Sequence, residues 1–565
     1  MESSSSEPAA PVRPRRRGLG ALAVASGILF SRVAGLVRTS VLASIFGVGA
    51  HADVWSAALR LPNLLQNLLG EQTLSAAFIP VYSRLLGAGR KEEAGRFAGA
   101  VFSLLAALAG GAALVGVLLA RPIVALFAPG FLGDQERIAQ GLATVDRYQL
   151  AVLAVRWIFP MSAILVLSAW ALGVLNSHRR FFLSYVAPVV WNASIIAAVW
   201  WVAAGRGAAP GGGEDRLLVA ACAGALAGGL LQFLIQIPGV IRDLEGFRFG
   251  FRLGNPAVRE AIAAFLPTVA GRGAVQFSSY IDQLLASWLV AGAIGALAYA
   301  QTLYLLPVSL FGLSLAAAAL PDLARQHGEG RSEAVERDLR RHLMLSSFLN
   351  LPASVAYLLL GLPLVQGIFQ LFGRRFGAEE SWLVYAVLAA YALGLPAATQ
   401  ARVLQSGLYA GGDARSPARY SVLRVSVGAA LGIPLMLSLD RFPVSTLWAR
   451  SAAVESSTLH LGALGLALAA SFAAWVEWWA LRRKVLATVR GFRWPAAEFR
   501  TLALWAVAAA VLPLALVASR ALAGWHPSLR ALLVGTLFGG GYLFLTRRSE
   551  PAQALRQRFG KGARR

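Results

Sequence analysis

Residues 101–119 read VFSLLAALAGGAALVGVLL, a run of nineteen residues without a charged side chain. As an α-helix this run would rise about 28 Å, close to the ~30 Å of hydrocarbon in a lipid bilayer. Comparable apolar runs lie at 161–175 and 502–517. Soluble core helices rarely combine this length with this apolarity. The sequence therefore predicts an all-α protein that crosses a membrane many times.

The composition supports the same class. Hydrophobic residues make up 57% of the chain and charged residues 14%, whereas soluble domains carry about 25% charged residues. The net charge of +24 does not indicate nucleic acid as a partner, because basic residues of membrane proteins gather in cytoplasmic loops beside lipid headgroups. The single cysteine, Cys222, excludes an internal disulfide and a multi-cysteine metal site, and we interpret it as a packing residue. Residues 1–17 form a Ser/Pro/Arg-rich tail with no cleavable signal pattern.

Hydropathy predicts about fourteen transmembrane helices, arranged as two six-helix bundles related by a pseudo-two-fold plus two C-terminal helices. The predicted spans lie near 20–45, 53–85, 97–120, 146–176, 182–204, 217–241, 257–288, 292–320, 342–372, 380–410, 417–437, 459–481, 499–519 and 527–546.

The distribution of basic residues predicts the orientation. If the N-terminus is cytoplasmic, the inside segments carry about three times as many Lys and Arg residues as the outside loops, which is the asymmetry of the positive-inside rule. Both termini are therefore expected in the cytoplasm. The basic inside segments are 13–17, 84–96, 179–180, 242–259, 325–341, 415–419, 482–500 and 547–565.

The two halves of the chain resemble each other. Leu-Pro at 61–62 is followed by Pro80 and Arg84, and Leu-Pro at 306–307 is followed by Pro321 and Arg325. Two similar six-helix units form a known transporter plan, with the site near the midplane between them. The predicted organisation is a cytoplasmic N-terminal tail (1–19), an N-terminal six-helix bundle (20–250), a C-terminal six-helix bundle (251–485), two extra transmembrane helices (486–546) and a basic cytoplasmic tail (547–565).

The first predicted span has a cationic face. Residues 31–39 read SRVAGLVRT, and at about 100° per residue Arg32 and Arg38 share an arc of ~120° with Ser31, Gly35 and Thr39. Arginine in hydrocarbon costs roughly 2.5–3.5 kcal/mol or more, so such residues face a wet cavity or a partner. Snorkelling to the interface suits Arg32 poorly, since it lies well inside the span. We expect both arginines to line a cavity.

Two other spans carry several polar residues. In the seventh, Arg272, Gln276, Ser279 and Gln283 fall on one helical stripe, with Asp282 beside them. The stripe is either interhelical hydrogen bonding or a cavity wall, and the arginine favours the wall. The second span carries Asp53, Arg60, Asn63, Gln66, Asn67, Glu71 and Gln72. Glu71 has two open roles, a charge partner in the cavity or an interhelical ion pair. Structural roles are predicted for Arg156, Arg402, Arg424 and Glu477.

A cavity with excess positive charge selects anions, and guanidinium binds phosphate bidentately. The expected substrate is therefore phosphorylated. The sequence holds no Walker A loop, dinucleotide fingerprint or His/Cys metal spacing, so we predict neither an enzyme nor a cofactor. The energy is expected to come from a membrane potential or an ion gradient, and Na⁺ and H⁺ both remain open as the coupling ion.

The chain resembles the MurJ (MviN) family of lipid II flippases within the MOP transporter superfamily. The resemblance covers nearly the whole chain and is densest at 31–38 (SRVAGLVR), 45–49 (IFGVG), 61–65 (LPNLL) and 75–80 (SAAFIP). It implies fourteen helices, a V-shaped central cavity, and export of undecaprenyl-diphosphate-linked disaccharide-pentapeptide for peptidoglycan synthesis by alternating access. Membrane lipids and peptidoglycan synthesis enzymes are further expected partners.

The resemblance also implies residue roles. Arg32 and Arg38 would contact the diphosphate, and Asp53 and Glu71 would be the functional acids of the second span. Two usual cavity cations are replaced, by Gln66-Asn67 and by Gln301-Thr302, and Arg272 is a candidate substitute. The predicted substrate-binding residues are Arg32, Arg38, Asp53, Asn63, Glu71, Arg272 and Gln276.

The leading hypothesis is a lipid II flippase. The alternatives are a flippase for another polyprenyl-diphosphate-linked glycan, such as an O-antigen or exopolysaccharide unit, and a non-transporting lipid-binding scaffold. A multidrug exporter of the same superfamily would favour an acidic cavity and is disfavoured.

Overall fold

The computed structural model describes residues 17–178, 180–204, 213–372, 375–447, 458–489, 492, 505–506, 509–510, 524–549 and 553. Within them the chain forms helices and no named strand, as the hydropathy pattern predicts. The first half contains α1 (Arg17–Phe46), α2 (Ala50–Leu69), α3 (Glu71–Ala77), α4 (Ile79–Gly87), α5 (Lys91–Leu118), α6 (Ala120–Phe127), α7 (Asp134–Ala139), α8 (Arg147–Ser177), α9 (Phe181–Ala204) and α10 (Gly213–Asp243). The second half contains α11 (Pro256–Ala286), α12 (Ala293–Pro307), η2 (Val308–Leu313), α13 (Ser314–Gly328), α14 (Ser332–Phe369), α15 (Ala378–Ala410), α16 (Arg415–Leu439) and α17 (Gly462–Thr488), followed by α19 (Pro527–Leu545).

Ten helical segments among the described residues are long and apolar enough to cross a membrane. The span predicted at 499–519 lies almost wholly outside the described residues. The span predicted at 53–85 is divided into α2, α3 and α4, with a break at Gly70 and Pro80 at the start of α4. The span predicted at 292–320 contains the π-helical turn η2 after Pro307. Both departures follow from proline and glycine, which interrupt the regular hydrogen-bond ladder.

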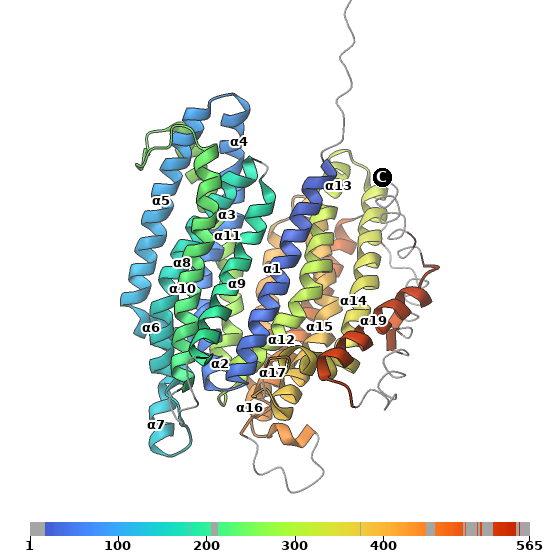
Figure 1. Cartoon of the computed structure of the whole chain (residues 1–565). Helices are drawn as coiled ribbons and strands as arrows, with labels where there is room; N and C mark the ends of the chain where they lie inside the picture. The colour runs from blue at the N-terminus through green and yellow to red at the C-terminus, as the bar shows by residue number, and fades with distance from the viewer. Residues whose placement is uncertain are drawn as a thin grey trace, which may run out of the picture.

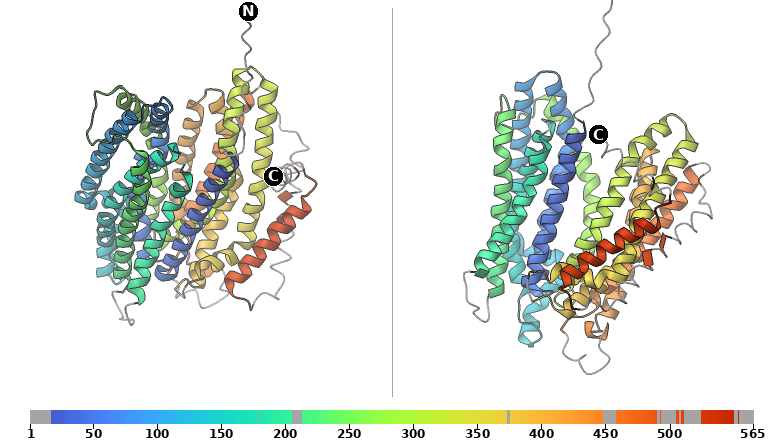
Figure 2. Two further views of the ribbon diagram at one scale, coloured as in Figure 1. Left: turned by 45° about the horizontal axis from the view of Figure 1, so that its top comes forward. Right: turned by 45° about the vertical axis from the view of Figure 1, so that its right-hand side comes forward.

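The helices form two groups that meet at one end and stand apart at the other, as the right-hand view of Figure 2 shows. We call the end where α1 finishes and α12 begins the sealed end, and the end where α1 begins the open end (Figure 1). The buried clusters agree with this arrangement. One cluster joins both halves through residues such as Phe46, Ile158, Leu289 and Phe376 at the sealed end. Separate clusters fill each half toward the open end.

Helix α11 belongs to both groups. It was predicted to open the second bundle, yet its first turns place Val258 and Ala261 in the buried cluster of the first half. Glu260 pairs there with Arg84 of α4. Its last turns place Leu285 and Ala286 in the shared cluster at the sealed end. The helix therefore passes from one half at the open end to the junction at the sealed end.

Small residues let the helices pack closely. Gly224 and Gly228 of α10 face α9, and a Cβ atom on Gly224 would lie 2.6 Å from the Cβ of Ala198. Inside a bilayer the hydrophobic effect does not drive helices together. Close van der Waals contact of this Gly-xxx-Gly kind stabilises their packing instead. Cys222, on the same helix, is 1% exposed, which confirms its expected packing position.

Among the described residues, basic segments of the first half that were predicted to face the cytoplasm lie together at the open end. Lys91 pairs with Glu245 at 2.8 Å, and Arg180 pairs with Asp243 at 2.8 Å. These pairs connect three segments that are distant in the sequence. In this part of the chain, the alternation of the helices agrees with the one assumed in counting basic residues.

Candidate functional site

A polar cavity of about 560 Å³ lies between α2, α11, α12, α15, α16 and α17. Its size falls within the range of small-molecule binding sites in proteins. Its charged lining residues are Arg60, Arg402, Arg424, Asp282 and Glu477. The described lining thus holds three cations and two acids, drawn from both halves of the chain.

The α2 wall of the cavity comes from one helical face. Arg60, Asn63 and Asn67 are spaced i, i+3 and i+7, so they lie along a single stripe. The Arg60 guanidinium donates a hydrogen bond to the Gln301 side-chain oxygen. The Gln301 amide in turn donates to the Tyr391 hydroxyl at 3.0 Å. This chain of contacts fixes the position of Arg60 relative to the second half.

Glu477 anchors the opposite wall. It is 2% exposed, and its carboxylate accepts hydrogen bonds from Gln405 at 3.0 Å, Ser421 at 3.1 Å and Arg424 at 3.1 Å. Three donors satisfy most of the capacity of one carboxylate and compensate its burial. Arg402 joins the network through the side-chain oxygen of Gln405 at 3.3 Å. Glu477 therefore holds Arg424 directly and Arg402 indirectly against the cavity.

Asp282 reaches the cavity from α11. Within the described residues no opposite charge lies close enough to form an ion pair with it, and the nearby charges acting on it are Arg60 and Arg424. Gln283, predicted to share the polar stripe that faces the cavity, is instead 1% exposed, and its amide has no hydrogen-bond partner in the described part of the chain. Asp282, predicted to lie beside the stripe, thus lines the cavity where Gln283 does not. The side chains of Arg272, Gln276 and Ser279 lie outside the described part of the chain.

The predicted residues of α1 occupy another place. Neither Arg32 nor Arg38 lies among the lining residues of this cavity. Arg32 is exposed. The Arg38 guanidinium stacks 4.8 Å from the ring centre of Trp191 on α9, and its Nε is buried without a hydrogen-bond partner among the described residues. Of the other predicted residues, Asn63 lines the cavity, and the side chains of Glu71, Arg272 and Gln276 lie outside the described part.

Asp53 lies at the sealed end and not in the cavity. It is fully buried, and its two carboxylate oxygens accept hydrogen bonds at 2.7 Å from the backbone N–H groups of Gly295 and Gly292. These groups mark the N-terminus of α12, where unpaired N–H donors and the helix dipole favour an anion. Gly292 has φ +102°, a conformation that side chains other than glycine rarely adopt. Asp53 of the first half therefore caps a helix of the second.

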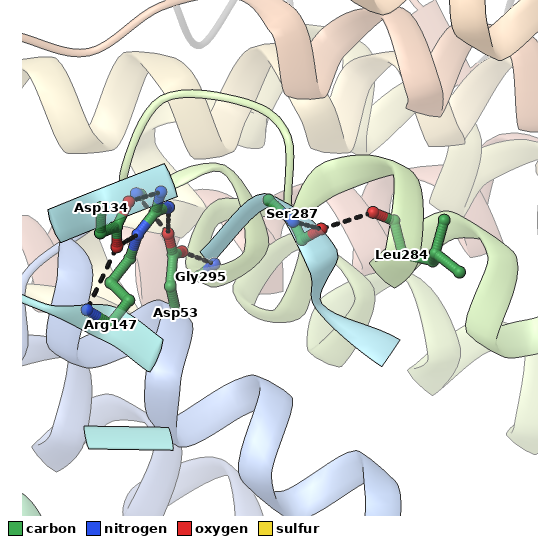
Figure 3. A network of polar contacts seen from close by, with 8 residues as sticks. Asp53, Asp134, Arg147, Leu284, Ser287 and Gly295 are labelled. Atoms are coloured by element: carbon green, nitrogen blue, oxygen red, sulfur yellow. Dashed lines mark hydrogen bonds and ion pairs between the residues drawn. The ribbon is translucent and has the colours of Figure 1, made fainter. Parts of the chain in front are cut away.

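Arg147 completes this contact (Figure 3). Its guanidinium lies 3.3 Å from Asp53 and binds Asp134 in a bidentate manner at 2.7 and 2.8 Å. All three side chains are almost completely buried. One arginine thus compensates two buried carboxylates, with backbone amides satisfying the remaining acceptors.

Further polar contacts cross the halves at the sealed end. The Gly130 N–H donates to the Ser287 hydroxyl at 3.1 Å. Glu214 pairs with Arg375 of the second half and lies 2.9 Å from His51, whose other ring nitrogen is 2.6 Å from Asp215. Together with the shared hydrophobic cluster, these contacts close the sealed end.

Sequence reasoning missed part of this arrangement. Arg147 lies outside the basic segments predicted to face the cytoplasm, and no role was predicted for Arg147 or Asp134. Arg402, Arg424 and Glu477 were assigned structural roles, and the Arg424–Glu477 pair confirms one of them, but all three also line the cavity. Their spacing held a signal, because Arg402 with Gln405 and Ser421 with Arg424 each repeat at i, i+3 on one helical face.

Comparison with known proteins gives consistent matches. The family model described as "Lipid II flippase MurJ" matches residues 42–538. A Rhizobium tropici protein named "Probable lipid II flippase MurJ" is 32% identical over 464 residues, which cover 81% of this chain and 78% of the relative. A Burkholderia cenocepacia protein named "Lipid II flippase MurJ" is 30% identical over 406 residues, covering 71% and 75%.

Two solved structures share the fold. "Lipid II flippase MurJ, inward closed conformation" aligns with a TM-score of 0.70 and 19% identity, covering 93% of this chain and 98% of that one. "Inward-facing conformation of a multidrug resistance MATE family transporter of the MOP superfamily" aligns with a TM-score of 0.60 and 14% identity, covering 84% and 100%. At these identities both matches concern the fold alone.

Proposed function

The chain belongs to the lipid II flippase MurJ family, and from this premise we propose that it moves lipid II from the inner to the outer leaflet of the bacterial cytoplasmic membrane. The protein is a multi-pass membrane protein. The observation that carries the proposal is the cavity between the halves, with three arginines in its described lining. Guanidinium pairs with phosphate oxygens in a planar, bidentate geometry, which suits the diphosphate of a lipid-linked sugar.

The proposed mechanism is alternating access. The two groups of helices separate at the open end and are joined at the sealed end by Asp53, Arg147 and the shared cluster. We infer that the open end faces the cytoplasm, where both termini would lie, and that this conformation accepts substrate from the inner leaflet. Outward release then requires the sealed-end contacts to part while the open end closes. A membrane potential or a gradient of Na⁺ or H⁺ supplies the energy in this proposal.

A depletion strain tests the substrate. Loss of a lipid II flippase leaves lipid II in the inner leaflet and causes lysis, because peptidoglycan synthesis consumes the precursor outside. Inner-leaflet lipid II can be measured by its resistance to a periplasmic enzyme or antibiotic added to spheroplasts. Loss of a surface glycan without lysis would instead indicate a flippase for another polyprenyl-diphosphate glycan. An unchanged distribution of both lipids would indicate the scaffold.

The arginines of α1 are proposed to contact the diphosphate during transport. Arg32→Ala and Arg38→Ala should each abolish complementation of the depletion strain while leaving the protein level intact. The reason is that a charged hydrogen bond to phosphate contributes about 1.5–3 kcal/mol, which alanine removes. Arg121→Ala is the matched control, since Arg121 is an exposed arginine of α6 outside the cavity lining. Full complementation by both α1 variants would refute these roles.

Two cavity cations usual in the family are replaced here by uncharged residues, among them Gln66 and Thr302. Arg272 of α11 is proposed to supply a positive charge in their place. Arg272→Ala should slow growth of the complemented strain, and Arg272→Lys should restore part of the rate because it retains the charge. Growth rate at limiting expression provides the measurement. An alanine variant that grows like the wild type would remove Arg272 from the site.

A further inference from the structure

The cations of the cavity are not equally neutralised. Arg424 forms an ion pair with Glu477 at 3.1 Å. Arg60 and Arg402 bind neutral side-chain oxygens, those of Gln301 and Gln405, and within the described residues neither has a carboxylate in ion-pair contact. Two guanidinium groups thus reach the cavity with their charges uncompensated by contact.

These two guanidinium groups also retain donors. A guanidinium carries five N–H donors in a rigid fork. The described contacts account for one hydrogen bond from Arg60 and one from Arg402. Each bond is made by a single terminal nitrogen, so the rest of each fork remains available to a ligand in the cavity. Both side chains are only partly buried, which agrees with access from the cavity.

Asp282 is the opposing element. It lines the same cavity, and Arg60 and Arg424 are the charges acting on it. Asp282 attracts Arg60 and repels an anion. An anion that binds Arg60 must therefore compete with Asp282 for the guanidinium group and lie close to a like charge. Glu477 does not oppose the anion in the same way, because three donors already satisfy it.

We propose that Arg60, Arg402 and Arg424 form a diphosphate-binding subsite on the wall of the cavity, separate from Arg32 and Arg38. The inference rests on the proposed function and names residues of its substrate site. Arg60 and Arg402 contact the two phosphates, whose two negative charges match the two uncompensated guanidinium groups. Arg424, on α16, is held by Glu477 and adds positive potential to the subsite without being the main phosphate contact. Glu477 is a positioning residue, since it acts through Arg424 and Gln405.

The subsite draws on both halves of the chain. Arg60 belongs to α2 of the first half, and Arg402 and Arg424 belong to α15 and α16 of the second. A diphosphate bound between them links the halves across the cavity. The anion should therefore bind more tightly when the two halves are close together than when they are far apart. Such a difference in affinity is what allows a ligand to shift a conformational equilibrium.

The test measures binding to the purified full-length chain by native mass spectrometry in detergent. The probes are undecaprenyl diphosphate, which carries the anion without sugar or peptide, undecaprenyl monophosphate, and lipid II. Arg60→Gln and Arg402→Gln should each weaken binding of undecaprenyl diphosphate about ten-fold or more, the range expected for a lost charged hydrogen bond. Arg402→Lys should recover part of the loss, because it restores charge without the fork. The monophosphate should bind more weakly than the diphosphate.

Two further variants separate binding from structure. Asp282→Asn should strengthen diphosphate binding several-fold, because it removes a repelling charge, and a purely structural role for Asp282 does not predict a gain. The double variant Arg424→Gln/Glu477→Gln keeps the buried pair neutral and should weaken binding. Arg121→Gln is the control and should bind like the wild type, because Arg121 is exposed and outside the cavity lining. Thermal unfolding of each variant identifies any that are misfolded.

The outcomes distinguish this subsite from the proposed function. If the wild type binds lipid II while Arg60→Gln and Arg402→Gln bind the diphosphate normally, the subsite is wrong and the function stands. If the wild type binds undecaprenyl diphosphate through these residues but rejects lipid II, the subsite stands and the substrate is another glycan. Binding of neither probe by the folded wild type would overturn both.

Discussion

Replacing Arg147 with methionine is expected to destabilise the protein by about 3–5 kcal/mol, the cost of removing one partner from a buried ion pair. The loss is large because Asp53 and Asp134 are 0% and 1% exposed and would face each other without a cation. The backbone amides of α12 satisfy only Asp53. Unfolding of the purified protein, followed by fluorescence-detected size exclusion after heating, measures the effect.

Two variants control for this interpretation. Arg121→Met, which removes an exposed arginine from the same end, should change stability little, because exposed charges contribute about 0–1 kcal/mol. Combining Arg147→Met with Asp53→Asn and Asp134→Asn should recover much of the loss, because no unpaired buried charge remains. A wild-type melting temperature for Arg147→Met alone would show that the three charges are solvated or otherwise compensated.

A disulfide across the sealed end is expected to stop transport completely. A Cβ atom built on Gly295 of α12 lies 2.9 Å from the Cβ of Ala52 on α2, about half an ångström or more below the separation in a disulfide. In a Cys222→Ala background, Ala52→Cys/Gly295→Cys should therefore crosslink after a small adjustment. The bond would hold the two halves together where alternating access requires them to separate. Complementation should fail under oxidising conditions and return with a reductant.

The matched control links helices within one half. A Cβ on Gly432 of α16 lies 3.7 Å from the Cβ of Ala469 on α17, so Gly432→Cys/Ala469→Cys forms a disulfide without joining the halves. This variant should support growth in both conditions. If the oxidised Ala52–Gly295 crosslink formed fully and growth continued, the sealed end would not open during transport, and the alternating-access proposal would fail.

Helix positions and the shared end of the basic segments were predictable, because both depend on local features. Hydropathy over about twenty residues identifies a span regardless of its neighbours, and the loops follow from the alternation of spans. The polar face of α2 was predictable in the same way, since Arg60, Asn63 and Asn67 are brought together by helical spacing alone.

The roles of individual charges were less predictable. The family resemblance implied a functional acid at Asp53, which was predicted to bind substrate. In this conformation its oxygens are occupied by α12 and Arg147. That prediction for Asp53 as a substrate contact therefore receives no support from its surroundings. On α11 only the last residue of the predicted stripe can be compared, and there Asp282 lines the cavity while Gln283 is buried.

By itself, the sequence determined that this protein spans a membrane repeatedly, which face of several helices is polar, and which loops are basic. Only the tertiary structure decided which charges meet, because the partners are far apart in the chain. Arg147 lies 94 residues from Asp53, and Gly295 lies 242 residues from it. A helical period places neighbours three or four residues apart on one face, whereas the choice of partner across two halves depends on how whole helices pack.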